Sequence, residues 1–254
     1  MNNTQRVAIV TGAGSGIGRA TAEMLGECGF AVVLAGRTRE TLEATAESVP
    51  GETLVLPADV GTETGARAIV EGAAGAFGRL DVLVNNAAVA PCKPFAEFGW
   101  AELERMYRVN SIGPMALIAA AWPVFAAQHA AQPTTGNPEH RPPEGHDNIA
   151  RIVNLSSMAT LDPFPGLAAY AASKAAVNLL TRACANEGAD AGIKAFAVAP
   201  GAVETAMLRS IASEDVLPRN MTLNPKQVAS VILACACGER DEENGSVILV
   251  PSPA

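Results

Sequence analysis

The sequence predicts a doubly wound α/β fold, in which one domain spanning residues 1–254 forms a seven-stranded parallel sheet with helices on both faces. Short, nearly continuous apolar runs alternate with longer Ala-rich runs, and parallel strands buried on both faces have this composition. A glycine-rich turn directly follows the first apolar run. The length of 254 residues suits a single large domain.

The strands are predicted where the runs are short and rich in β-branched residues. They are Val7–Val10, Ala31–Ala35, Thr53–Pro57, Val82–Val84, Ile152–Leu155, Ala195–Val198 and Val247–Val250. The helices are predicted between them, at Ile17–Cys28, Glu40–Ser48, Thr62–Phe77, Glu102–Gln128, Ala168–Ala189 and Pro225–Cys237. Strands and helices that alternate in this way pack through right-handed crossovers.

Residues 129–148 break this alternation with four prolines and two glycines. Such a segment cannot form a core helix or strand, so it is predicted as a surface insert loop. All three histidines, His129, His140 and His146, fall in it. A metal site would need three or four converging ligands, so no metal is expected.

The overall charge and the cysteines exclude several functions. A formal net charge of −8, with scattered Lys and Arg residues, does not indicate a basic surface that would bind nucleic acid or an anionic membrane. No uninterrupted apolar run reaches the length of a membrane span, and no signal peptide is expected before the first predicted strand. Because the five cysteines are an odd number in a large chain, a framework of disulfides is not expected. A reduced, cytoplasmic protein is expected.

The turn at residues 11–18, Thr-Gly-Ala-Gly-Ser-Gly-Ile-Gly, predicts a phosphate site. Its glycines Gly12, Gly16 and Gly18 fit the pattern T-G-x-x-x-G-x-G between a strand and a helix. Free N–H groups and the helix dipole at that point favour a pyrophosphate. The alternative is a tight turn that binds nothing.

Arg37 indicates which dinucleotide is bound. An acidic residue at the end of the second strand hydrogen-bonds the ribose of NAD, whereas an Arg accepts the 2′-phosphate of NADP. Here the strand ends in Gly36-Arg37-Thr38-Arg39, with no acid before Glu40. The charge therefore favours NADP, with NAD left open.

Further motifs follow the other strands in order: Asp59-Val60, Asn85-Asn86-Ala87-Ala88, Asn110, Ser157, Tyr170 with Lys174, and Pro200-Gly201 with Thr205. With the glycine turn, they make the chain resemble the classical short-chain dehydrogenase/reductases over nearly its whole length. The resemblance implies a Rossmann-type sheet and a catalytic tetrad of Asn110, Ser157, Tyr170 and Lys174. The cofactor contacts that it implies, together with Arg37 from the charge argument, are Thr11, Gly12, Ser15, Gly16, Ile17, Gly18, Arg37, Asp59, Val60, Asn86, Ala87, Ala88, Tyr170, Lys174, Pro200, Gly201, Val203 and Thr205.

The tetrad suits proton transfer. Tyr170 and Lys174 are four residues apart on a predicted helix and share one face. A nearby ammonium is expected to lower the pKa of the phenol, so that Tyr170 acts as general acid or base. Ser157 would bind the substrate oxygen, and it is preferred to Ser156 because it lies 13 residues before Tyr170, the usual family spacing. Asn110 would hold a water next to Lys174.

The predicted function is NADP-dependent interconversion of a small-molecule carbonyl and a secondary alcohol. The alternatives are an NAD-preferring alcohol dehydrogenase, a non-catalytic dinucleotide sensor, and an epimerase or dehydratase of nucleotide sugars. Substrate contacts are expected from residues 89–93, 158–164 and 202–207, with Leu161, Phe164 and Met207 forming an apolar pocket. The family implies a homotetramer or homodimer.

Two features depart from the family pattern. Ala88 stands where the family has Gly, which is tolerable if its φ is negative. The last strand is followed by Pro-Ser-Pro-Ala, where the family commonly has Asp-Gly-Gly, and the lid segment from Leu208 to Leu223 is short. The changed ending and the short lid concern the substrate and the packing of subunits.

Overall fold

The computed structural model describes residues 5–131 and 148–253, and its centre is a seven-stranded, all-parallel sheet. The strand order is β3-β2-β1-β4-β5-β6-β7, which is the predicted doubly wound arrangement. The strands are β1 (Val7–Thr11), β2 (Ala31–Gly36), β3 (Thr53–Pro57), β4 (Val82–Asn85), β5 (Ala150–Leu155), β6 (Ile193–Pro200) and β7 (Val247–Val250). All seven predicted strands are confirmed, each within two residues at either end.

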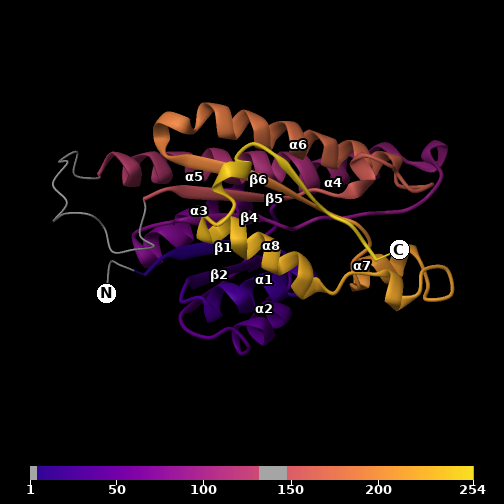
Figure 1. Cartoon of the computed structure of the whole chain (residues 1–254), viewed down its shortest axis with the longest axis horizontal. Coiled ribbons are helices and arrows are strands. Elements are labelled where there is room, and N and C mark those ends of the chain that lie inside the picture. The colour runs from indigo at the N-terminus through magenta and orange to yellow at the C-terminus, as the bar shows by residue number, and fades with distance from the viewer. Residues whose placement is uncertain (1–4, 132–147, 254) are drawn as a thin grey trace.

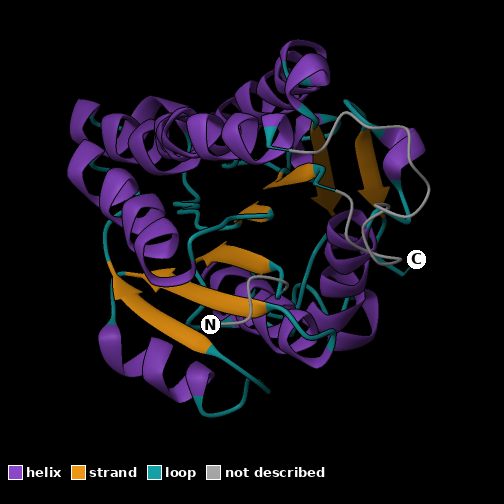
Figure 2. Ribbon diagram, turned by 90° about the vertical axis from the view of Figure 1, so that its left-hand side faces the viewer, coloured by secondary structure: helices purple, strands orange, loops and turns teal. Residues whose placement is uncertain are grey.

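Helices cover both faces of the sheet (Figures 1 and 2). One face carries α3 (Glu63–Phe77), α5 (Gly113–Ala130) and α6 (Ala168–Glu187), which bury Ile69, Phe125 and Cys184 against it. The other face carries α1 (Gly16–Glu27), α2 (Arg39–Ala46) and α8 (Pro225–Cys237), which bury Leu25, Leu42 and Ile232. The sheet therefore lies between two apolar layers, as the unbroken apolar strands predicted.

The predicted helix over Glu102–Gln128 is interrupted. It consists of α4 (Trp100–Tyr107), one π-helical turn (Arg108–Ile112) and α5. A π turn is often found at functional sites and here it contains Asn110. The continuous apolar pattern gave no sign of it, because every residue of the turn is compatible with an α-helix.

Two further predictions need correction at the end of α5. The helix continues to Ala130, so His129 lies in its last turn and outside any loop; a helix-compatible Gln-His-Ala-Ala sequence allows this. Residues 132–147 of the predicted insert, including His140 and His146, lie outside the described residues. The helical run Trp100–Ala130 is also long and apolar enough by composition to cross a membrane, but half of its apolar window is buried within this fold. Core helices of globular domains pass the same test.

The sheet places a crevice at one edge. The chain leaves β1 towards β2 and leaves β4 in the opposite direction, although β1 and β4 are neighbours. Ligands of doubly wound sheets bind where the strand order reverses in this way, beyond the carboxyl ends of the strands. The glycine turn follows β1 at this point.

Candidate active site

A cavity of about 780 Å³ opens along the carboxyl edge of the sheet. Its walls come from the segments that follow the strands, from β3 at one end to β6 at the other. The predicted site residues that line it are Gly12, Ser15, Gly16, Ile17, Arg37, Asp59, Val60, Asn86, Ala87, Ala88, Ser157, Tyr170, Lys174, Pro200, Gly201, Val203 and Thr205. Thr11, Gly18 and Asn110 do not line it.

The glycine turn is shaped for a close approach. Gly12 and Gly16 have φ angles of 66° and 54°, where a side chain would be strained. Gly18 has no such angle, but a Cβ there would overlap the carbonyl oxygen of Gly12 and lie 2.5 Å from Nδ2 of Asn86. Gly18 therefore lets the first turn of α1 pack against the end of β1.

Thr11 and Asn86 brace this turn from behind. The side-chain amide of Asn86 donates to the carbonyl of Thr11 at 2.8 Å, and the backbone N–H groups of Asn86 and Ala87 donate to Oγ1 of Thr11 at 3.0 and 3.1 Å. Thr11 is almost fully buried. Thr11 therefore links the ends of β1 and β4 and stabilises the glycine turn.

The turn fits a dinucleotide pyrophosphate. Ser15, the residue before α1, has an extended backbone, and its side chain makes no capping bond to the helix. The first N–H groups of α1 therefore have no side-chain cap, and Ser15, Gly16 and Ile17 line the cavity. A helix N-terminus with glycines beside it is an anion site. Thr205 lies close to this turn, since its Cγ2 would be 3.1 Å from a Cβ on Gly16.

Two arginines and an aspartate form the end of the cavity nearest β2 and β3. Arg37 follows β2, is exposed, and lines the cavity together with Thr38. Burial raises the pKa of Asp59, but the N–H of Gly61 and the guanidinium groups of Arg105 and Arg37 outweigh it and hold that pKa below its usual value. Arg105 reaches Asp59 from α4 at 3.0 Å. Sequence reasoning missed Arg105, because a helical Arg 46 positions further along the chain gives no sign of this contact.

The two neighbouring serines after β5 point to different partners. Ser156 donates to Oδ1 of Asn178 at 2.5 Å and is buried. Ser157 lines the cavity, and its hydroxyl is hydrogen-bonded to Tyr170. The geometry therefore places Ser157, and not Ser156, beside the phenol.

Tyr170 and Lys174 share one face of α6, as predicted, but their effect on each other is not the expected one. Burial raises the pKa of Tyr170 to about 12, and the hydrogen bond with Ser157 offsets only part of this. Burial also lowers the pKa of Lys174 to about 8. Nζ of Lys174 donates to the carbonyl of Leu155 at 2.6 Å and lies 6.0 Å from the centre of the Tyr170 ring. The expected lowering of the phenol pKa by the ammonium is therefore wrong for this state of the protein.

Asn110 is buried behind the cavity wall. Its Oδ1 accepts from the N–H of Val89 at 2.9 Å, and its Nδ2 donates to the carbonyl of Val89 at 2.9 Å and to Oγ of Ser173 at 3.0 Å. These bonds tie the segment after β4 to α6, one residue before Lys174. Its side-chain amide thus positions two walls of the site.

The end of the cavity nearest β5 and β6 is apolar, and we call it the apolar end. It is lined by Val89, Ala90, Met158, Leu161, Phe164, Leu167, Met207, Leu208, Ile211, Val216 and Leu217. Leu161, Phe164 and Met207 were predicted here. Leu208 and Ile211 belong with Met207 to α7 (Ala206–Ile211), which was not predicted as a helix. Val216 and Leu217 belong to the loop that follows α7.

The C-terminal tail packs against the segment after β6. The N–H of Ala202 donates to Oγ of Ser252 at 2.7 Å, and the N–H of Gly201 donates to the carbonyl of Val250 at 3.0 Å. A Cβ on Gly201 would overlap Oγ of Ser252. The unusual Pro-Ser-Pro ending therefore holds a wall of the cavity. Ala88, the other departure, has a negative φ, so its methyl group is tolerated.

Comparisons with known proteins identify the family of this chain. The family model for short chain dehydrogenase matches residues 6–132 and 144–216. An uncharacterized oxidoreductase of Listeria monocytogenes is 32% identical over 243 residues, with 91% of this chain and 90% of that protein covered. One from Staphylococcus aureus is 30% identical over 231 residues, with the same coverage.

Solved structures are similar over the whole chain. The 3-ketoacyl-(acyl-carrier-protein) reductase from Brucella melitensis, complexed with NADH, has a TM-score of 0.86 at 28% identity and covers 96% of both chains. Levodione reductase has a TM-score of 0.83 at 27% identity and covers 98% of this chain and 96% of its own. The chain belongs to the short-chain dehydrogenase family and is an NAD(P)-dependent oxidoreductase.

Proposed function

We propose that this enzyme reduces a small-molecule ketone to a secondary alcohol with NADPH, and that Tyr170 donates the proton. The observation that carries the proposal is the half-buried Tyr170 phenol, hydrogen-bonded to Ser157 and one helical turn from Lys174, all three lining one cavity. A pKa of about 12 keeps this phenol protonated at neutral pH. A protonated acid suits reduction, which needs a proton at the carbonyl oxygen.

The residues have separate tasks in this reaction. When bound, the reduced nicotinamide supplies a hydride to the carbonyl carbon. Ser157 donates a hydrogen bond to the carbonyl oxygen and supports the negative charge that develops there. Tyr170 gives its proton to that oxygen, and solvent later restores it. The ammonium of Lys174 stabilises the phenolate that Tyr170 briefly becomes.

The cofactor preference rests on Arg37. Its guanidinium lines the cavity just after β2, among residues that leave no acid at the strand end. A planar guanidinium suits bidentate binding of a phosphate. This supports NADP, while the NADH in the Brucella melitensis reductase keeps NAD as the alternative.

A non-catalytic sensor is the second function class, and the site argues against it. A sensor needs the glycine turn and Arg37, but it needs neither an acid nor a buried cation beyond the nicotinamide position. Here Lys174 is 2% exposed and is held by the Leu155 carbonyl. Burying a charged amine is costly, so a catalytic use is the better explanation.

We also propose that the enzyme is a cytoplasmic homo-oligomer. The outer side of α4–α6 carries exposed apolar side chains, among them Trp100, Ile112, Met115 and Leu179. Large exposed apolar groups of this kind are typical of subunit interfaces. Light scattering of the purified protein measures the assembly, and a monomer would contradict this proposal.

The function is tested by following oxidation of NADPH and NADH with a panel of ketones, and the reverse reaction with secondary alcohols. We expect turnover of at least one ketone, with higher kcat/KM for NADPH than for NADH. Binding of the cofactor without turnover of any compound would support the sensor instead.

A further inference from the structure

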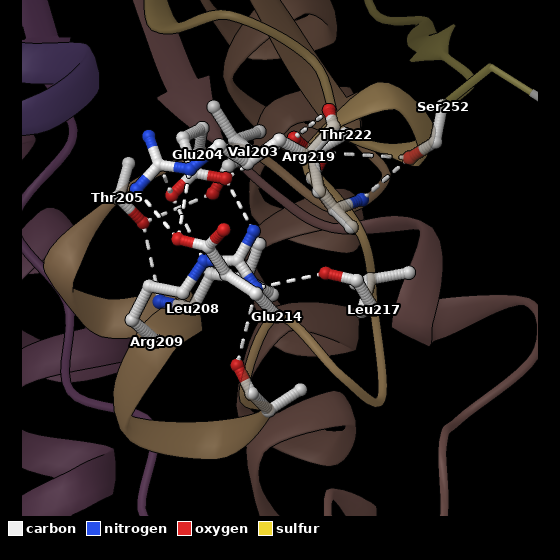
Figure 3. Close-up of polar contacts among 12 residues, drawn as sticks. Val203, Glu204, Thr205, Leu208, Arg209, Glu214, Leu217, Arg219, Thr222 and Ser252 are labelled. Carbon is white, nitrogen blue, oxygen red and sulfur yellow. Dashed lines mark hydrogen bonds and ion pairs between the residues drawn. The ribbon is translucent and has the colours of Figure 1, made fainter.

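The charges of the lid over the apolar end are directed away from the substrate. The structure extends the lid predicted at Leu208–Leu223 to include all of α7, which begins at Ala206. Figure 3 shows polar side chains of this lid gathered in one cluster with Glu204, which precedes α7. Nε of Arg209 donates to Oε1 of Glu204 at 2.9 Å, and its Nη1 donates to the carbonyls of Ala212 and Leu217 at 3.3 and 2.8 Å. Arg219 pairs with Glu214 at 2.6 Å.

This cluster keeps its members out of the cavity. Arg209, Glu204, Glu214 and Arg219 do not line it, although the neighbouring lid residues Met207 and Leu208 do. The hydrogen bond from Arg209 lowers the pKa of Glu204 to about 2, so that the carboxylate stays charged and paired at neutral pH. The lid thus presents hydrocarbon to the substrate and holds its charges on the other side.

The cations around the apolar end are therefore engaged elsewhere. Nζ of Lys93, three residues beyond Ala90 of the cavity wall, lies 2.6 Å from Oε2 of Glu102. Among the described residues that line the cavity, the cations are Arg37 and Arg105 at the far end and Lys174 at the catalytic position. The acidic residue that lines the apolar end is Asp162.

From this charge pattern we propose that the substrate is an uncharged, lipophilic ketone or alcohol, and that carboxylates and phosphates are rejected. The inference rests on the proposed function and names its substrate class. An anion held at the apolar end would lose part of its hydration without gaining a cation among the described lining residues, which is unfavourable. It would also lie near Asp162, an exposed acidic residue that lines this end. An uncharged alkyl chain meets neither penalty and gains from each methylene buried.

The test compares matched substrates on the full-length enzyme with NADPH. Methyl esters of 3-oxo acids are set against the free 3-oxo acids of the same chain, so that each pair differs only in the charge and in one methyl group. We expect kcat/KM for the ester to exceed that for the acid by about 100-fold. It should also rise by about twofold to fourfold for each methylene added to the chain.

Two variants distinguish the effect of the carboxylate in the cavity from the effect of the protein's net charge. Asp162→Asn removes the carboxylate at the apolar end, and we expect it to raise the acid-to-ester ratio of kcat/KM by about threefold to tenfold. Asp215→Asn makes the same change at an exposed lid position that does not line the cavity. This control should leave the ratio unchanged.

The outcomes are distinguishable. An acid reduced as well as its ester overturns the substrate class while leaving the reductase function intact. An unchanged ratio in Asp162→Asn overturns the role given to that carboxylate. No turnover of any ketone, with either NADPH or NADH, overturns the proposed function itself.

Discussion

Replacing Gly18 by Ala tests whether the glycine turn depends on close packing. The new Cβ would lie 2.5 Å from Nδ2 of Asn86 and 2.8 Å from the carbonyl carbon of Gly12, where carbon contacts normally lie near 3.5 to 4 Å. Overpacking of this kind typically costs about 1–3 kcal/mol. Losing the Asn86 bond to Thr11 adds about 1 kcal/mol. Better helix propensity of Ala returns about 0.5–1 kcal/mol.

The net expectation is a destabilisation of about 1–3 kcal/mol, or a fall in Tm of roughly 3–10 °C for a domain of this size. Differential scanning calorimetry measures the Tm, and titration calorimetry with NADPH should show weaker binding. Gly75→Ala is the matched control, because Gly75 lies in α3 with nothing within 4 Å of the added Cβ. It should raise the Tm slightly. A Gly18→Ala protein as stable as the wild type, with unchanged NADPH affinity, would refute the packing argument.

Three further predictions concern the cofactor and the proton. Arg37→Asp should lower kcat/KM with NADPH by about 10- to 100-fold and raise it with NADH, since it replaces a phosphate partner by a charge that repels phosphate; an unchanged ratio contradicts this. Ser252→Ala should raise KM for NADPH about fivefold, because Ala202 N–H loses its acceptor, with kcat less affected; steady-state kinetics with an unchanged KM would disprove it. Lys174 has a pKa lowered to about 8, so kcat/KM for reduction should fall as the pH rises through about 8 and the ammonium is lost; a flat pH profile would contradict it.

The fold and most of the site were predictable because they rest on local patterns. Each strand is a short apolar run, and several cofactor motifs directly follow or end a strand, so the parallel sheet alone brings Gly12, Asp59 and Pro200 to one edge. The same reasoning placed Tyr170 and Lys174 on one helix face. These features need only the periodicity of each element and the direction of its neighbours.

Contacts between distant side chains were not predictable. Arg105 reaches Asp59 from another helix, and Ser252 reaches Ala202 from the C-terminal tail. The π turn around Asn110 depends on hydrogen bonds to Val89 and Ser173, which the helical pattern does not record. Nor did the spacing of Tyr170 and Lys174 reveal that burial would dominate the pKa values of both groups.

The central claim is that Tyr170 donates the proton during reduction, and Tyr170→Phe tests it most directly. The substitution removes one hydroxyl and leaves the ring, so cofactor binding and the Tm should remain close to those of the wild type. Single-turnover reduction of a ketone, at saturating NADPH, should slow by about 10²–10⁴-fold, the usual contribution of a general acid. A variant that retains more than about a tenth of the wild-type rate, far outside that range, would contradict the assignment.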